Sequence, residues 1–112
     1  MKLWVDDERP SPNRRGWVHA MTSGKAIEAL TMYRDATSRL DMPFAEMVEE
    51  ISLDHDLGGE DNGMIVLDFM VESNLWPAVL TIHTANPPAR QRMLATANRY
   101  GPEELEIFVK YW

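Results

Sequence analysis

Three short apolar runs in this chain end in polar side chains that could do chemistry. The runs cover 3–5, 51–53 and 79–82, and they are followed in that order by DD, DHD and HTAN. The acidic members of these motifs are Asp6, Asp7, Asp54 and Asp56. Carboxylates that share one crevice repel one another unless a cation or a shared proton relieves the repulsion. A divalent ion is the simplest remedy, and such oxygen ligands suit Mg²⁺ or Mn²⁺ bound to phosphate oxygens rather than Zn²⁺.

The remaining polar residues near these motifs suit a phosphate group. They are Arg9, His55, His83, Thr84, Asn86 and Lys110. Side chains of these types can neutralise or protonate phosphate oxygens, and a pair of histidines at adjacent strand ends can serve as general acid and base. The acidic cluster and its donors therefore predict a site that handles phosphate.

Several of these residues also have a purely structural interpretation. Asn86 before Pro87 is a good helix N-cap, and Asp56 can form an Asx turn before the glycines that follow. Thr84 can be an ordinary β-branched strand residue, and Lys110 a solvated charge. Arg9 can either pair with the preceding acids or face a phosphate, and the sequence does not choose between these roles.

The elements that must position these residues alternate between strand and helix. Strands are expected at 3–5, 17–21, 51–53, 79–82 and 107–109. Helices are expected to start at Thr22 or Ser23, at Asp61 or Asn62, and at Asn86, the last of them ending at Gly101. The segment 41–50 has no clear pattern. This alternation predicts an α/β fold with a mostly parallel sheet, in which the carboxyl ends of the strands gather distant residues at one edge.

Length and composition limit the class of protein. With 112 residues, 45% of them hydrophobic and 26% charged, the chain suits a single globular domain over 1–112. The net charge of −7 excludes broad, non-specific electrostatic binding to DNA phosphates. No apolar run approaches the ~20 residues of a membrane helix. The absence of cysteine and of a signal-peptide pattern makes a cytoplasmic location the expectation.

Four motifs resemble those of response-regulator receiver domains. They are VDDERP at 5–10, SLDHDLG at 52–58, IHTANP at 82–87 and IFVKYW at 107–112. In order and spacing they match the acid pair, the acceptor aspartate, the hydroxyl residue and the terminal lysine of that family. More narrowly, DDERP, LDHDLG with its following Asn-Gly turn, and HTANP resemble a diverged branch, the cyclic-phosphate processing receiver-like domain.

The resemblance implies a flavodoxin-like receiver fold with five strands in the order 2-1-3-4-5. The chain departs from that pattern in two places. The segment 8–16 contains two prolines and no apolar stripe, and the sequence stops just after the fifth strand. We therefore expect the first and fifth receiver helices to be absent. Because both pack on the same sheet face in receivers, that face would be thinly covered, which predicts a homodimer through it.

The resemblance also implies a role for each site residue. The implied metal ligands are the carboxylates of Asp6, Asp7 and Asp54 and the backbone carbonyl of Asp56. Asp54 is in addition the phospho-acceptor of a receiver, and Thr84 and Lys110 are implied to contact phosphoryl oxygens. His55, His83 and Asn86 belong to the narrower resemblance.

Two functions from different classes follow. The first is a Mg²⁺- or Mn²⁺-dependent phosphoesterase acting on a cyclic phosphate, either an RNA end or a cyclic nucleotide. Asp54 would be nucleophile or ligand, and His55 or His83 would move the proton. The alternative is a non-catalytic, stripped receiver that accepts phosphate at Asp54 or binds a phosphorylated ligand and signals to a protein partner. The paired histidines favour the enzyme, and the match of Thr84 and Lys110 favours the switch.

Overall fold

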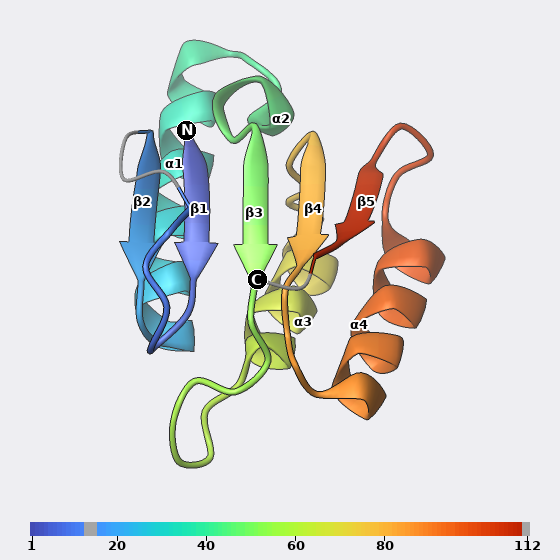
Figure 1. The fold of residues 1–112 in the computed structure, drawn as a ribbon. Helices are drawn as coiled ribbons and strands as arrows, with labels where there is room; N and C mark the ends of the chain where they lie inside the picture. The colour runs from blue at the N-terminus through green and yellow to red at the C-terminus, as the bar shows by residue number, and fades with distance from the viewer. Residues whose placement is uncertain (13–15, 111–112) are drawn as a thin grey trace.

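A computed structural model of the chain, which describes residues 1–12 and 16–110, contains one parallel sheet and helices packed against it (Figure 1). The strands are β1 (Lys2–Val5), β2 (Trp17–Ala20), β3 (Glu50–Leu53), β4 (Val79–Ile82) and β5 (Glu106–Val109). The helices are α1 (Ser23–Leu40), α2 (Phe44–Met47), α3 (Gly63–Ser73) and α4 (Pro87–Tyr100). The strand order is β2-β1-β3-β4-β5. This is the α/β, receiver-like flavodoxin architecture that the sequence motifs imply.

The register of the three central strands brings the polar motifs to one level. Val5 pairs with Leu53, and Leu53 pairs with Ile82. The ladder then continues for one more residue, because Asp54 N donates to Val5 O at 2.9 Å and His83 N donates to Leu53 O at 3.0 Å. The residues that follow β1, β3 and β4 therefore lie side by side at the carboxyl edge of the sheet, as parallel strands require.

The helices begin where side chains can satisfy their first backbone donors. Thr22, Asn62 and Asn86 are the N-caps, and their side chains accept hydrogen bonds from Lys25 N, Ile65 N and Ala89 N respectively. Asp61, the alternative cap of α3, instead accepts hydrogen bonds from the backbone N–H and the hydroxyl of Ser23. It thereby joins the start of α1 to the loop before α3. The single turn of α2 lies in the segment 41–50, where the sequence shows no pattern.

The core lies between the sheet and the helices. Alternate strand residues point to this side: Leu3, Val5, Ile51, Leu53, Leu80 and Ile82 are all fully buried there. They pack against apolar residues of the helices, among them Leu30 of α1, Leu67 of α3 and Met93 of α4. Since side chains alternate along a strand, Trp4, Ser52 and Thr81 must point to the opposite face. No described helix is long and apolar enough to cross a membrane.

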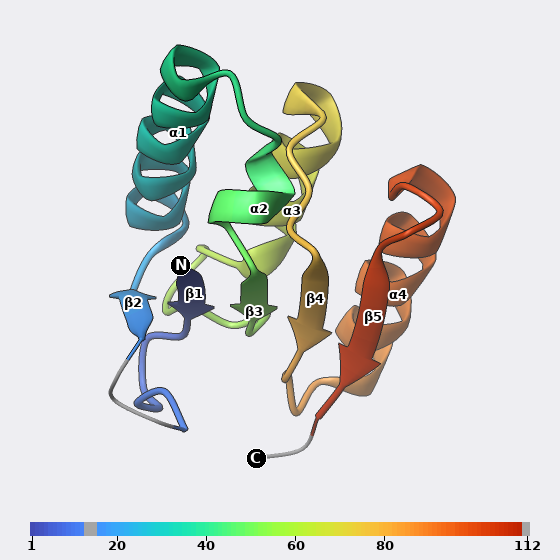
Figure 2. The same cartoon turned by 90° about the horizontal axis from the view of Figure 1, so that it is seen from above.

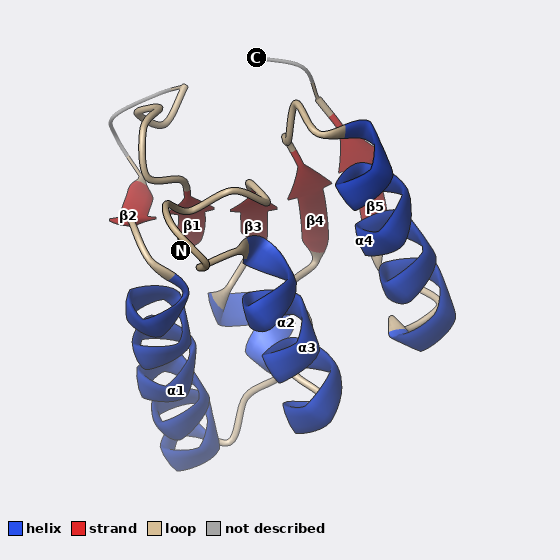
Figure 3. Ribbon diagram, turned by 90° about the horizontal axis from the view of Figure 1, so that it is seen from below, coloured by secondary structure: helices blue, strands red, loops and turns tan. Residues whose placement is uncertain are grey.

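All the described helices lie on one side of the sheet (Figures 2 and 3). Residues 8–12 and 16 form no helix, as predicted, while 13–15 lie outside the described residues, and none follows β5 up to residue 110. On this helix-free face Trp4 is nevertheless buried: its Nε1 donates to Arg9 O at 2.8 Å, and its ring makes a T-shaped contact with that of Trp17. The chain itself thus covers part of the face. Association of two copies of the chain through the rest of the helix-free face stays a prediction.

Candidate metal and phosphate site

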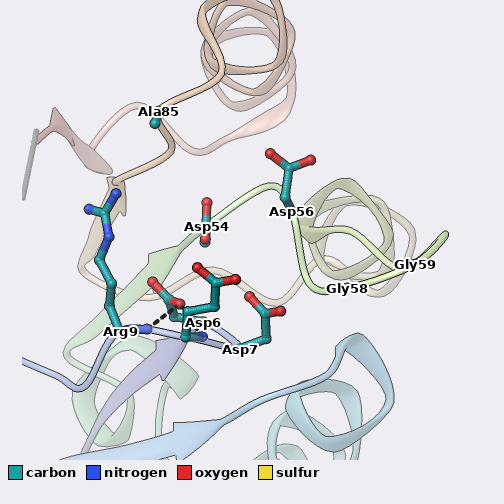
Figure 4. Close-up of a pocket in the computed structure, with 9 residues that line it drawn as sticks. Asp6, Asp7, Arg9, Asp54, Asp56, Gly58, Gly59 and Ala85 are labelled. Atoms are coloured by element: carbon teal, nitrogen blue, oxygen red, sulfur yellow. Dashed lines mark hydrogen bonds between the residues drawn. The ribbon is translucent and has the colours of Figure 1, made fainter.

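The predicted acidic residues meet in a cavity of about 310 Å³ at the carboxyl ends of β1 and β3 (Figure 4). Its lining consists of Asp6, Asp7, Glu8, Arg9, Asp54, Asp56, Gly58, Gly59 and Ala85. All four aspartates that the sequence singled out therefore face one hollow. Arg9 lies on one side of them and Asp56 on the other, so the cavity has one cationic wall. Six of the nine lining residues are charged.

Asp6 is the most tightly held of these acids. It is fully buried, and its Oδ1 accepts hydrogen bonds from the backbone N–H groups of Glu8 and Arg9, both at 2.8 Å. Its Oδ2 lies 3.0 Å from Nε2 of His83. A carboxylate offers about four lone-pair positions, two on each oxygen. Oδ1 is thus saturated by the protein, and Oδ2 retains room for one further bond.

His83 lies beneath Asp6 on the helix-free face and does not line the cavity. Its ring stacks on Trp4 at 3.9 Å between centroids, and Nδ1 lies 2.7 Å from the hydroxyl of Ser52. Burial lowers the pKa of His83 to about 4, although the hydrogen bond and the charge of Asp6 act to raise it. His83 is therefore neutral at pH 7. Because the Asp6 carboxylate can only accept, Nε2–H donates to Asp6, and Nδ1 accepts the Ser52 hydroxyl proton.

We expect the free energy of unfolding to fall as the pH drops from about 6.5 to about 4. The pKa of His83 is near 6.5 in the unfolded chain and about 4 in the folded one, so only the unfolded chain binds this proton in that window. The contribution is fully present above the window and lost below it, and it amounts to about 3 kcal/mol at 1.36 kcal/mol per unit. Urea denaturation between pH 7.5 and pH 4 measures it. His83→Gln should flatten this slope, and an unchanged slope in that variant would contradict the assignment.

Asp54 is half-buried and sits beside Asp6. Its Oδ1 accepts the backbone N–H of His55 at 2.7 Å, and the hydroxyl of Thr84 donates to the same carboxylate. Burial raises the pKa of Asp54, as do the negative charges of Asp6 and Asp56, and the two hydrogen bonds offset this only in part. The site thus disfavours a second full negative charge, which is the electrostatic condition that a bound cation relieves.

One ligand atom each from Asp6, Asp54 and His83 lies within 4.8 Å of the others, so this cluster could hold a metal ion. The imidazole Nε2 already serves Asp6 as a donor, which leaves carboxylate oxygens as the ligands that face the cavity. Asp7 also lines it, and its Oδ2 points at the turn formed by Gly58. An all-oxygen set of this kind fits Mg²⁺ or Mn²⁺ better than a thiophilic metal.

The loop between β3 and α3 shapes the far wall of the cavity. Gly58 and Gly59 adopt φ of +92° and +57°, a left-handed conformation that glycine adopts without strain. The loop closes on itself through an antiparallel bridge between Asp56 and Asn62, and Gly63 N donates to His55 O at 2.7 Å. The loop therefore folds back against the backbone of Asp54 and presents Asp56 to the cavity.

The family model of the cyclic-phosphate processing receiver domain matches residues 1–99. The chain belongs to this family. The match includes every cavity-lining residue and ends one residue before the end of α4. Neither the curated proteins nor the solved structures compared with the chain gave a match. The family description associates this receiver domain with cyclic-phosphate processing.

Five residues predicted for the receiver's site do not line the cavity: His55, Asn86, Lys110 and the buried His83 and Thr84. Nδ1 of His55 lies 3.0 Å from Asp56 Oδ1, and its Nε2 lies 3.4 Å from an Arg92 guanidinium nitrogen. The amide oxygen of Asn86 caps α4, which is its structural role. Lys110 is exposed, and its backbone N–H continues the β4–β5 ladder.

The structure also adds residues that the sequence analysis overlooked. Ser52 and Trp4 hold His83, and Glu8 lines the cavity and supplies a backbone N–H to Asp6. The hydroxyl of Ser52 interrupts an apolar run, and a polar residue in the middle of a buried strand is the signal that could have revealed it. Two kinds of residue thus form the site, acids that face the cavity and buried groups that hold them.

Proposed function

We propose that this receiver domain is a divalent-metal-dependent phosphoesterase that opens a cyclic phosphate, carried by an RNA end or a cyclic nucleotide. The observation that carries the proposal is the pairing of Asp6 and Asp54, two carboxylates within one 4.8 Å group, at the base of a cavity that also holds Arg9. The raised pKa of Asp54 supports the proposal, because two neighbouring carboxylates repel each other when both are ionised and a bound cation would remove that repulsion.

Mg²⁺ or Mn²⁺ would be held by Oδ2 of Asp6 and by the carboxylates of Asp54 and Asp7. When bound, such an ion supplies Lewis-acid polarisation of phosphoryl oxygens. The hydrogen bonds on Oδ1 of Asp6 leave that residue one bond to offer, from Oδ2. The two backbone N–H groups and the His83 ring thus fix the direction in which Asp6 presents its free lone pair to a metal ion.

The chain's own groups suit the other requirements of the reaction. Arg9 faces the cavity and is placed to bind phosphate oxygens that point away from the acids. Asp54 is either the nucleophile or a ligand. We assign the proton transfer to His55 rather than His83, because both ring nitrogens of His83 are buried and engaged. His55 directly follows Asp54, and its ring nitrogens make their contacts with Asp56 and Arg92 at the protein surface rather than in the interior.

The test is incubation with Mg²⁺ and a panel of 2′,3′- and 3′,5′-cyclic nucleotides, and in parallel with acetyl phosphate. Wild-type protein should open at least one class of ring only when metal is present, and Asp54→Asn should abolish this activity. His55→Gln should reduce it by about 10²- to 10⁴-fold, the usual contribution of a general acid or base.

Asp68→Asn is the matched control, because Asp68 is an exposed acid on α3 outside the cavity. This variant should keep wild-type activity. A stable, acid-labile adduct formed from acetyl phosphate on Asp54, with no ring opening, would contradict the proposal and support the signalling receiver instead. The hydrogen bond from Thr84 to Asp54 is the feature of the site that would serve such a switch.

A further inference from the structure

A row of buried polar side chains runs across the helix-free face of the sheet and ends at Asp6. Ser52, at the centre of the row, pairs in register with Trp4 of β1 and with Thr81 of β4. His83 follows β4 on the same face as Thr81, yet its ring lies against Trp4 on the far side of β3. The ring therefore crosses above Ser52, and the small side chain at this position leaves the space for it.

Among the described residues, Trp4 and Ser52 hold the His83 ring through contacts of different kinds. The stack on Trp4, with an angle of 5° between the planes, prevents the imidazole from tilting. Stacking does not prevent rotation within the ring plane. The Ser52 hydroxyl, 2.7 Å from Nδ1, supplies the second fixed point and sets the direction in which Nε2–H is aimed. That direction is Oδ2 of Asp6, 3.0 Å away.

We propose that Ser52 is a positioning residue for the acidic site: through the His83 ring, its hydroxyl fixes the Asp6 carboxylate that faces the cavity. The inference rests on the metal site of the proposed function. Ser52 is fully buried and His83 is 1% exposed, so water does not compete for these bonds. Removing a residue that orients a metal ligand through hydrogen bonds typically weakens metal affinity by about 10- to 100-fold.

Ser52→Ala tests this directly, because alanine keeps the space for the ring and removes only the hydroxyl. The variant should bind Mn²⁺ about 10- to 100-fold more weakly in calorimetric titration. In the metal-free protein, the Nε2–H proton of His83 should give a slowly exchanging ¹⁵N-coupled NMR signal, and Ser52→Ala should accelerate its exchange. Ser52→Cys, with a weaker donor of similar size, should fall between wild type and alanine in both measurements.

Thr81→Val is the matched control. Thr81 is equally buried in the same row, but its hydroxyl donates to Glu50 and not to the chain that leads to Asp6. It should leave Mn²⁺ affinity and the His83 exchange rate unchanged. Wild-type affinity and wild-type exchange in Ser52→Ala would overturn the inference. Failure of the wild-type protein to bind Mn²⁺ would overturn the metal site itself, and the NMR measurement on metal-free protein would still report whether Ser52 holds His83.

Discussion

Replacing Asp54 by asparagine is expected to make the metal-free protein more stable at pH 7. Burial and the charge of Asp6 raise the pKa of Asp54 above its value in the unfolded chain. Its contribution to stability is therefore favourable at low pH and is lost as the pH rises through the folded pKa. At pH 7 the ionised carboxylate destabilises the fold, whereas an amide keeps the shape and still accepts the His55 N–H. Urea denaturation in the presence of a chelator measures the difference.

The same comparison in saturating Mg²⁺ should reverse the order of stability. A ligand that binds only the folded state stabilises it by about 2.7 kcal/mol at a hundred times its dissociation constant. Wild-type protein should gain this amount, and Asp54→Asn should gain almost nothing because it has lost a ligand. The control Asp68→Asn should behave as wild type in both conditions. Equal stabilisation of the Asp54 variant by Mg²⁺ would contradict the assignment of this residue as a ligand.

Gly63→Ala is expected to destabilise the protein severely. A Cβ at Gly63 would lie 2.0 Å from the backbone oxygen of Asp54 and 3.1 Å from its carbonyl carbon. Backbone atoms cannot rotate away, so the start of α3 and the strand end that carries Asp54 must separate. We expect a loss of about 3 kcal/mol or more, at or above the upper end of the range for overpacked sites, together with weaker metal binding.

Gly24→Ala is the natural comparison, because it makes the same substitution in the first turn of α1. There the nearest atom to a new Cβ is the Thr22 hydroxyl oxygen at 3.9 Å, an ordinary contact. This variant should gain about 0.5–1 kcal/mol from the better helix propensity of alanine. Urea denaturation of both variants measures the contrast. A Gly63 variant that matches wild type would show that the loop is not held against Asp54 as described.

The parts of the fold that follow local rules could be predicted from the sequence. Asn86 followed by Pro87 predicts the start of α4, because that pair satisfies or removes the first backbone donors. The predicted strands agree with the structure to within one residue: β4 is as expected, β1, β3 and β5 start one residue earlier, and β2 ends at Ala20 rather than Met21. The convergence of Asp6 and Asp54 followed from parallel pairing alone.

The arrangement of His55 and His83 could not be predicted from the fact that each follows the end of a strand. The positions of His55 and His83 after adjacent strands predict a pair, whereas the structure buries His83 under Asp6 and directs His55 toward Asp56 and Arg92. The alternation of side chains along β4 does indicate which face His83 occupies. Ile82 points into the core, so the next residue points to the opposite face of the sheet. That His83 then reaches across β3 depends on the size of Ser52 and on Trp4, which lie far away in the sequence.

Paramagnetic broadening by Mn²⁺ tests most directly whether the cavity is a divalent-metal site. Substoichiometric Mn²⁺ added to ¹⁵N-labelled protein should first erase the amide signals of Asp7, Asp54 and Gly58, while those around Thr37, near the carboxyl-terminal end of α1, persist. Asp54→Asn should need far more Mn²⁺ for the same effect. Broadening that spreads evenly over the exposed acids, or that is identical in the variant, would contradict the site.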